Sequence, residues 1–192
     1  YIVYKSVGKG GVDNGTRVDR PCFSLDIEPG VVYHFKVTAC NSGGESFPSE
    51  VIAAVREPNA SKTVLVVNGF HRLSSPALLN DGRQGFDLDA DLGVTEGLTA
   101  GWNGRFIAGN DFNYVSDHVA AIASAHKYNV VSCSSHAIET GIVDVNDYDA
   151  VDLVLGLEKY AANQTRYYKT FAPVMKNTLT RYLANGGKLL VS

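Results

Sequence analysis

The sequence predicts a chain in two parts, an all-β part followed by an α/β part built on a parallel sheet. Residues 1–56 hold short runs of β-branched and aromatic residues separated by turn sequences. From residue 62 onward, short continuous apolar runs alternate with segments of helical spacing, which is typical of crossover units in a parallel sheet covered by helices. Between them, residues 57–61 (Glu-Pro-Asn-Ala-Ser) are polar and contain proline, so they are the natural linker.

The first part is expected to contain strands only. Turn chemistry lies at Gly8–Gly11, Asn14-Gly15, Pro29-Gly30 and Asn41–Gly44, and no stretch between these turns shows helical spacing. The strands expected are residues 1–6, 17–18, 23–27, 31–40 and 51–55.

The second part is expected to form one parallel sheet with helices on its faces. Continuous apolar runs are the form of strands buried on both sides. One helix is expected over residues 117–126, opened by Ser116-Asp117-His118, and another over 171–184, ended by Asn185-Gly186-Gly187. The strands expected are residues 63–67, 129–133, 150–155 and 188–191, in a sheet of the flavodoxin-like kind.

The composition and net charge limit the classes of function that the chain is expected to have. The chain has 192 residues, 45% of them hydrophobic and 19% charged, which is a globular balance. The net charge is −3 and the pI is near 5.9, so the basic surface of a nucleic-acid binder is not expected. The longest apolar runs are of strand length, so no membrane span is predicted. The chain opens on Tyr1 in a strand-like run, which we interpret as a piece of a longer protein.

The three cysteines are Cys22, Cys40 and Cys133. They show no CxxC spacing and no histidine neighbours at zinc-ligand distances, which favours small buried hydrophobic residues over metal ligands. A Cys22–Cys40 bridge stays open as an alternative for a secreted chain. Neither a metal nor a cofactor is predicted.

Residues 25–41, followed by Gly44, Ser46, Pro48 and Ser49, resemble the second half of a fibronectin type III module, an immunoglobulin-like fold. The resemblance implies that Tyr33, after the Pro29-Gly30 turn, forms the tyrosine corner, with its hydroxyl bonded to the backbone near residues 27–29. It also implies that residues 1–6 are the third strand of the module. A sandwich without its first two strands leaves an open edge, which either further chain completes or unusual packing covers.

The second part resembles the class I glutamine amidotransferase-like fold in two segments, residues 148–156 and 179–192. It resembles more narrowly a domain of secreted Bacteroidetes proteins labelled xanthan lyase or N-acetylmuramoyl-alanine amidase, which often carry a fibronectin type III module upstream. This resemblance implies an extracellular or cell-envelope location. It also implies polysaccharide or peptidoglycan, and other domains of the same parent chain, as partners. The residues that carry it are 64–69 with Phe70, Arg72 and Pro76, then 109–114 and 117–118.

One candidate ligand site is the rim at the carboxyl ends of the predicted parallel strands. Ligands of open α/β sheets bind at that edge. Polar residues follow the first strand there, and others follow the second and third strands. The rim residues are Asn68, His71, Arg72, Ser134 and Glu158, with Glu139 on the same side.

Three histidines are candidates for chemistry, and each has a plainer interpretation. Cys133 and His136, if both lie on one strand, point to opposite faces, so a structural role is favoured over a catalytic dyad. His118 is interpreted as a polar residue beside the capping carboxylate of Asp117. His34 alternates with a neighbouring phenylalanine on a strand and is expected to face the surface.

The long segment 69–113 is rich in Gly, Asp and Asn, and segments of this length are more often functional than plain linkers. Its acidic run 87–91 lacks the glycine and bidentate glutamate of an EF-hand, with leucine at positions 92 and 98, which favours a solvated loop over a calcium site. Its aromatic residues either stack on sugars or anchor the segment onto the sheet, and anchoring is favoured. The residues concerned are Trp102, Phe106 and Phe112, together with Tyr114 directly after the segment.

Three functions remain, in order of preference. The first is a non-catalytic spacer or scaffold fragment of a secreted glycan- or peptidoglycan-acting enzyme. The second is a hydrolase or amidotransferase-like enzyme whose nucleophile lies beyond Ser192. The third is a carbohydrate-binding module that uses segment 69–113. No Gly-x-Ser-x-Gly or Gly-x-Cys-x-Gly elbow occurs in the sequence, so we expect the chain alone to be catalytically silent.

Overall fold

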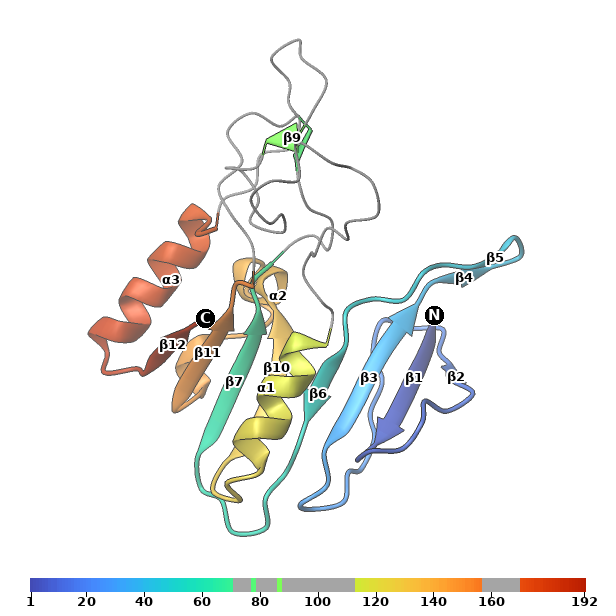
Figure 1. Cartoon of the computed structure of the whole chain (residues 1–192), viewed down its shortest axis with the longest axis horizontal. Helices are drawn as coiled ribbons and strands as arrows, with labels where there is room; N and C mark the ends of the chain where they lie inside the picture. The colour runs from blue at the N-terminus through green and yellow to red at the C-terminus, as the bar shows by residue number, and fades with distance from the viewer. Residues whose placement is uncertain (71–76, 79–85, 88–112, 157–169) are drawn as a thin grey trace.

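The computed structural model describes residues 1–70, 77–78, 86–87, 113–156 and 170–192. Two four-stranded sheets dominate these residues, one antiparallel and one parallel, so the chain is of mixed α/β class (Figure 1). Two short hairpins complete the strands: β4 (Cys40–Asn41) with β5 (Gly44–Glu45), and β8 (Ala77–Leu78) with β9 (Phe86–Asp87).

The antiparallel sheet has the order β2-β1-β3-β6. Its strands are β2 (Thr16–Arg17), β1 (Ile2–Val7), β3 (Tyr33–Thr38) and β6 (Ile52–Ala54). The strand expected at 23–27 does not form. The side chains of Phe23 and Leu25 remain exposed, at 39% and 41%. A run of strand-forming residues becomes a strand only where a neighbouring edge offers hydrogen-bond partners.

The tyrosine-corner prediction is confirmed. Tyr33 is buried, and its hydroxyl accepts a hydrogen bond of 3.2 Å from the backbone N–H of Glu28. The preceding turn contains Gly30 at φ 76°, in the left-handed region that glycine adopts without a steric cost. The corner fixes residues 28–33 against the start of β3.

The parallel sheet has the order β10-β7-β11-β12, and all its pairings are parallel. This confirms the prediction that the four apolar runs lie parallel in one sheet. The central strand β7 is buried along almost its whole length, as a strand between two neighbours and two covered faces should be. The strands are β7 (Thr63–Asn68), β10 (Asn129–Ser134), β11 (Ala150–Val154) and β12 (Leu189–Val191).

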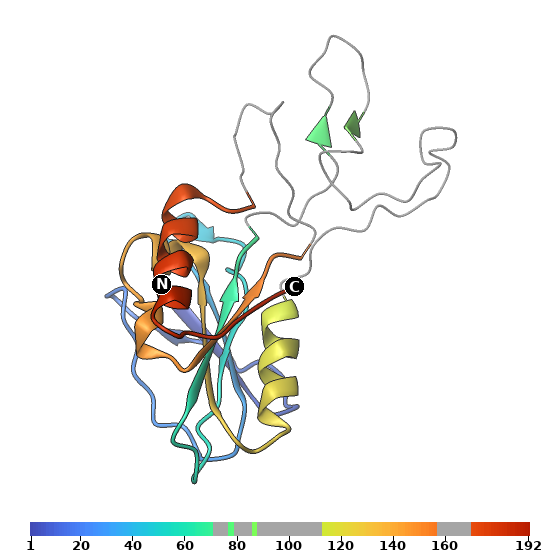
Figure 2. The ribbon, with the colours of Figure 1, turned by 90° about the vertical axis from the view of Figure 1, so that its left-hand side faces the viewer.

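Helices cover both faces of the parallel sheet (Figure 2). The helix α1 (Tyr114–Ala123) packs on one face, where Val64 and Val66 belong to its core cluster. The helices α2 (Ser135–Glu139) and α3 (Pro173–Ala184) lie on the other face, with the short 3-10 helix η2 (Val145–Asp147). Among the described residues, no helix has the length and apolar character needed to cross a membrane.

The helix boundaries differ from the expected ones at their first residues. The expected helix at 117–126 begins three residues earlier, and its N-cap is Asn113 rather than the Ser116–Asp117 pair, so Asp117 stands inside the first turn. It also ends earlier, so His126 lies beyond the helix, at φ 51°. The expected helix at 171–184 begins at Pro173, because proline is well suited to the first turn of a helix. Its C-terminal signal, Asn185 then Gly186 at φ 88°, is confirmed.

The two sheets meet edge to edge (Figure 1). Directly after β6, Val55 and Val130 of β10 exchange two backbone hydrogen bonds of 2.8 and 3.0 Å in an antiparallel bridge. Ser132 Oγ adds two more, accepting from Ala53 N–H at 2.7 Å and donating to its carbonyl at 2.8 Å. Ala53 and Val55 share one core cluster with residues of β7 and α1. The strands of both parts are therefore one continuous hydrogen-bonded array.

The joining segment takes part in this contact. Glu57 is buried at 7% exposure, its backbone N–H donates to Asn129 Oδ1 at 2.9 Å, and its carboxylate lies 3.2 Å from the His126 ring. Residues Pro58 and Asn59 turn at the surface. The start of the segment is thus held by two polar interactions, one to β10 and one to the turn that follows α1.

His34 does not face the surface as expected. It is half-buried, with Nδ1 2.7 Å from Ser116 Oγ of α1, and burial lowers its pKa below the ordinary value. The expectation was wrong because α1 begins early enough for Ser116 to reach β3. Alternation along a strand shows which residues share a face, but another element decides whether that face is covered.

Candidate functional site

The carboxyl ends of three parallel strands bring together two of the predicted rim residues. Asn68 ends β7 and is in register with Ser134 at the end of β10, and with Val154 at the end of β11. The chain crosses from β7 to β10 through α1 on one face and returns to β11 through α2 on the other. This makes the β7–β11 boundary a topological switch point, where ligands of open α/β sheets bind. His71, Arg72 and Glu158 lie outside the described residues.

Close packing at this boundary requires a glycine. A Cβ on Gly69 would lie 2.8 Å from Leu153 Cδ1 and 3.0 Å from the carbonyl oxygen of Val154. The Gly69 N–H donates to that same carbonyl at 2.8 Å, which extends the β7–β11 pairing past the strand end. The backbone at the switch point is therefore held tightly by main-chain and side-chain contacts.

The two rim residues differ in what their side chains are free to do. Ser134 Oγ accepts from Ala137 N–H at 3.4 Å as the N-cap of α2, which gives it a structural role. Asn68 is 4% exposed, and within the described part of the chain its Oδ1 has no hydrogen-bond partner. A buried acceptor without a partner is uncommon and marks a place where a ligand, ion or water is expected.

A pair of polar side chains, His118 and Asp152, lies on the face of the parallel sheet that α1 covers. This pair was not predicted from the sequence. His118 Nδ1 of α1 lies 2.7 Å from Asp152 Oδ2 in the middle of β11. Asp152 is buried at 4% exposure, whereas the His118 side chain is 31% exposed. A buried carboxylate is strongly unfavourable unless it is paired, so the imidazole is the partner that keeps Asp152 in the core.

Sequence reasoning missed this pair for a definable reason. Asp152 lies inside the apolar run 150–155, whose composition as a whole predicts a buried strand, and His118 stands beside Asp117, which the pattern predicts as a capping residue. The signal present was a single charged residue in a strand buried on both faces. Such a residue demands a partner from a covering helix.

The pair and Asn68 lie close together on the α1 face. Asp152 is in register with Val66, two residues before Asn68 on the adjacent strand, so both side chains point to the same face. Asp152 Oδ1, like Asn68 Oδ1, is buried without a partner in the described residues. An imidazole that donates from Nδ1 to a carboxylate keeps Nε2 as an acceptor, the arrangement of a general base with its orienting group.

The Cys133–His136 dyad considered from the sequence does not form. The two residues were expected on one strand, but β10 ends at Ser134 and His136 lies on α2, because Ser134 caps a helix directly after the strand. Cys133 is buried in the core, and burial raises its pKa to about 12. The thiol is therefore neutral at physiological pH and is a poor nucleophile.

We expect Cys133 to resist alkylation in the folded chain while Cys22, which is exposed, reacts. Iodoacetamide labelling followed by mass spectrometry at neutral pH measures both rates, and rapid labelling of Cys133 would contradict its burial.

Because the pKa of Cys133 in the folded chain lies above that of the free thiol, the folded state binds more protons than the unfolded state between roughly pH 9 and 12. The contribution of Cys133 to the free energy of unfolding is therefore complete below pH 9 and falls as the pH rises through that window.

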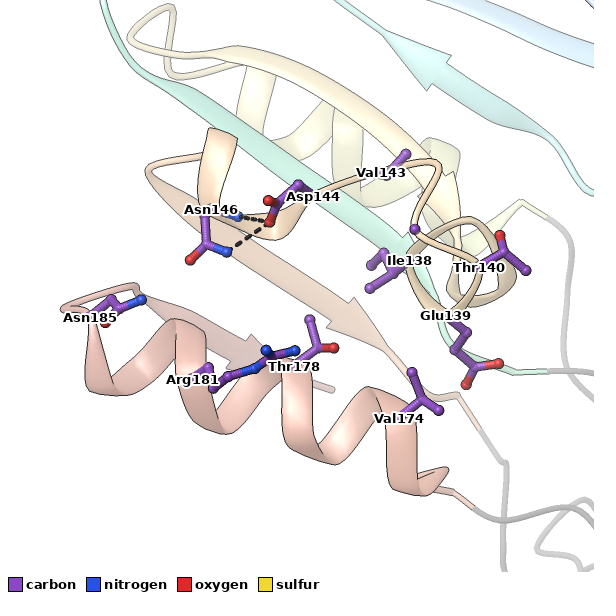
Figure 3. A pocket seen from close by; sticks show the side chains of 11 residues that line it. Ile138, Glu139, Thr140, Val143, Asp144, Asn146, Val174, Thr178, Arg181 and Asn185 are labelled. Atoms are coloured by element: carbon purple, nitrogen blue, oxygen red, sulfur yellow. Dashed lines mark hydrogen bonds between the residues drawn. The ribbon is translucent and has the colours of Figure 1, made fainter.

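A polar pocket lies on the opposite face, between α2 and α3 (Figure 3). Its volume is about 540 Å³. Asp144 accepts from the backbone N–H and the side-chain amide of Asn146 at 2.9 and 2.7 Å, and these bonds, with the more distant Arg181, hold its pKa below the usual range. Glu139, expected on the sheet rim, lines this pocket instead because it ends α2. The pocket offers hydrogen bonds to a polar ligand, and its lining residues in the described part of the chain include no cysteine, serine or histidine.

The other sequence candidates are only partly covered by the described residues. Tyr114 is half-buried at the start of α1 and packs edge-to-face on Phe70, with ring centroids 5.9 Å apart, which favours the anchoring role. Trp102, Phe106 and Phe112 lie outside the described residues, as do residues 88–91 of the acidic run. Within the described ranges, no three His, Cys, Asp or Glu residues are grouped to hold a metal ion, and the three cysteines are free thiols.

Comparisons with models of known protein families, with curated proteins and with solved structures found no match to this chain. The resemblances to the fibronectin type III module and to the glutamine amidotransferase-like fold therefore stay predictions.

Proposed function

We propose that this chain is a rigid, non-catalytic spacer that holds other domains of a secreted glycan- or peptidoglycan-acting enzyme in a fixed orientation. The observation that carries the proposal is the edge-to-edge joining of the two sheets. Residues of β10 form hydrogen bonds with Ala53, Val55 and Glu57. Ala53 and Val55 also belong to the hydrophobic core beneath α1. A flexible linker would leave these groups in water, whereas a spacer that transmits orientation needs them fixed.

The finer fold of the second part is also a proposal. Numbered along the chain, its strands lie in the order 2-1-3-4, which matches the first four strands of a flavodoxin-like sheet. This strand order supports the proposal that the α/β part is a flavodoxin-like or glutamine amidotransferase-like domain. The extracellular location and the polysaccharide or peptidoglycan partners follow from the family resemblance of the sequence.

Hydrogen exchange of the 192-residue chain tests the rigidity. We expect the N–H groups of Val55 and Val130 to be protected to the same degree as the N–H of Val66 in the central strand. The variant Val55→Pro removes one donor of the bridge and should separate thermal unfolding into two transitions. Asn59→Ala, in the surface turn, leaves every donor of the bridge in place; it is the control and should keep one transition. Fast exchange at Val55 and Val130 in the unmodified chain would contradict the rigid spacer.

Activity assays test the non-catalytic part of the proposal. The purified chain is expected to turn over neither glutamine, peptidoglycan nor acidic polysaccharides. Cys133 is a protonated core thiol, Ser134 is engaged as a helix cap, and the sequence contains no nucleophile elbow. Turnover that is abolished by Cys133→Ala or His118→Ala would overturn the spacer.

A hydrolase or amidotransferase-like enzyme is the second candidate, and the His118–Asp152 pair favours it. Their 2.7 Å contact supplies a base and its orienting carboxylate, two of the three parts of a nucleophilic site. The third part, a nucleophile, would come from chain beyond Ser192. A longer chain that gains activity, lost in His118→Gln, would favour this candidate over the spacer.

A further inference from the structure

The polar pocket between α2 and α3 is rich in side chains that end in a planar pair of polar atoms (Figure 3). Carboxylates, carboxamides and guanidinium groups are of this kind, and five of the 11 lining residues carry one. They are Glu139 at the end of α2, Asp144 and Asn146 at η2, and Arg181 and Asn185 at the end of α3. The pocket, called here the α2–α3 pocket, therefore presents paired hydrogen-bonding atoms from three elements.

The charges of Asp144 and Arg181 partly compensate each other. The hydrogen bonds from the backbone N–H and the side-chain amide of Asn146 hold the pKa of Asp144 below its usual value, and the nearby Arg181 lowers it further. A carboxylate placed on Arg181 would therefore also lie near Asp144, and an ammonium group placed on Asp144 would lie near Arg181. The pocket favours a ligand without a net charge.

The carboxylate of Asp144 is also fixed in position. Both hydrogen bonds from Asn146 go to Oδ1, so they do not occupy Oδ2. Among the side chains drawn in Figure 3, these are the only hydrogen bonds, so Arg181 makes none to the other walls of the pocket. An acceptor and a fork of donors thus face one ligand space without being bonded to each other.

We propose that the α2–α3 pocket binds a neutral pyranose sugar. A hydroxyl group both donates and accepts hydrogen bonds, so neighbouring hydroxyls on a sugar ring can bond to carboxylates, amides and guanidinium groups alike. A planar pair of polar atoms engages two such neighbours at once. A peptide amide holds its donor and its acceptor on opposite sides, so each planar group would engage only one of them.

The rest of the pocket fits the same ligand. Ile138, Val143 and Val174 supply an apolar surface for the C–H face of a sugar ring. The volume of about 540 Å³ lies within the range of about 300–1,000 Å³ that is usual for small-molecule sites. The proposal does not rest on the spacer function, because none of the lining residues takes part in the junction of the two sheets.

Titration of the 192-residue chain with glucose, galactose, mannose and N-acetylglucosamine, each up to about 50 mM, tests the proposal. Backbone amide chemical shifts locate and measure the binding. We expect at least one of these sugars to shift the amides of Thr140, Asp144, Asn146 and Thr178. Absence of these shifts with all four sugars, or shifts confined to the face covered by α1, would overturn the proposal.

Charged probes show whether hydroxyls or ions are recognised. The uronic acid and the 2-amino form of the sugar that binds have the same ring and one charge each. We expect neither to bind more tightly than the neutral sugar, because each charge meets a like charge on one wall of the pocket. Tighter binding of either one would show a site for an ion, and stronger shifts with diglycine than with the sugars would show a site for peptides. Both results would overturn the proposal.

Three exposed or half-buried residues give variants that separate paired hydrogen bonding from charge, and circular dichroism checks that each variant folds. Arg181→Lys keeps the charge but loses the planar fork, so it should weaken sugar binding about ten-fold. Glu139→Gln keeps a planar pair without the charge and should change the affinity by less than about three-fold. Lys176→Ala, on α3 but outside the pocket, is the control and should change it by less than about two-fold. Unchanged affinity in Arg181→Lys would contradict recognition by the fork.

Discussion

Replacing Leu65 by Ala is expected to lower the free energy of unfolding by about 2–5 kcal/mol. Leu65 is 1% exposed at the centre of β7, between β10 and β11, and belongs to the core cluster beneath α2 and α3. The neighbouring side chains come from strands fixed by parallel pairing, so they cannot relax to fill the space. Denaturant unfolding followed by circular dichroism measures the change.

The matched control is Leu190→Ala, the same chemical change on an edge strand. Because Leu190 is 61% exposed, we expect a cost of about 0.5 kcal/mol or less. Equal effects of the two substitutions would contradict the placement of the core around β7.

Replacing His118 by Ala is expected to lower the free energy of unfolding by about 3 kcal/mol at neutral pH. The substitution removes the partner of Asp152 Oδ2 and leaves a carboxylate buried with both oxygens unsatisfied. The expected value lies at the low end of the range for buried pairs, because His118 is 31% exposed and water can approach from its side. Denaturant unfolding of the purified variant measures it.

A double-mutant cycle shows whether the loss comes from this pair. In a chain that already carries Asp152→Asn, the cost of His118→Ala should fall by at least about 1 kcal/mol, because no charge is left unpaired. His136→Ala, on the exposed side of α2, is the control and should be close to neutral. A His118→Ala cost that is unchanged in the Asp152→Asn background would contradict the coupling.

Local patterns were sufficient for most of the parallel sheet. The apolar runs at 63–67, 129–133, 150–155 and 188–191 have the composition of strands buried on both faces, and each became a strand of one sheet. Tyr33 was placed correctly because the corner depends on a turn and a tyrosine a few residues apart. The same reasoning failed at residues 23–27, where the strand-like composition met no partner strand.

The candidate site was predicted only at the level of the sheet edge. Asn68 and Ser134 do meet at the carboxyl ends of adjacent strands, because strand ends in a parallel sheet share one edge. The role of Ser134 as a helix cap, and the helix that places His136 away from Cys133, depend on where β10 ends. A boundary shift of one or two residues, small in the sequence pattern, changes which side chains can react.

The sequence by itself determined that strands come first and an α/β part follows, and that the four apolar runs of the second part lie parallel in one sheet; it predicted neither the helix α2 nor the absence of a strand at 23–27. These features depend on residue spacing, which acts over a few positions along the chain. Only the tertiary structure decided that Asp152 has His118 as its partner and that Val55 bonds to Val130. The first pair is 34 residues apart and the second 75, and nothing in the local pattern specifies either. Burial imposes both choices, because a carboxylate or a backbone N–H removed from water must find a partner in whichever element packs against it.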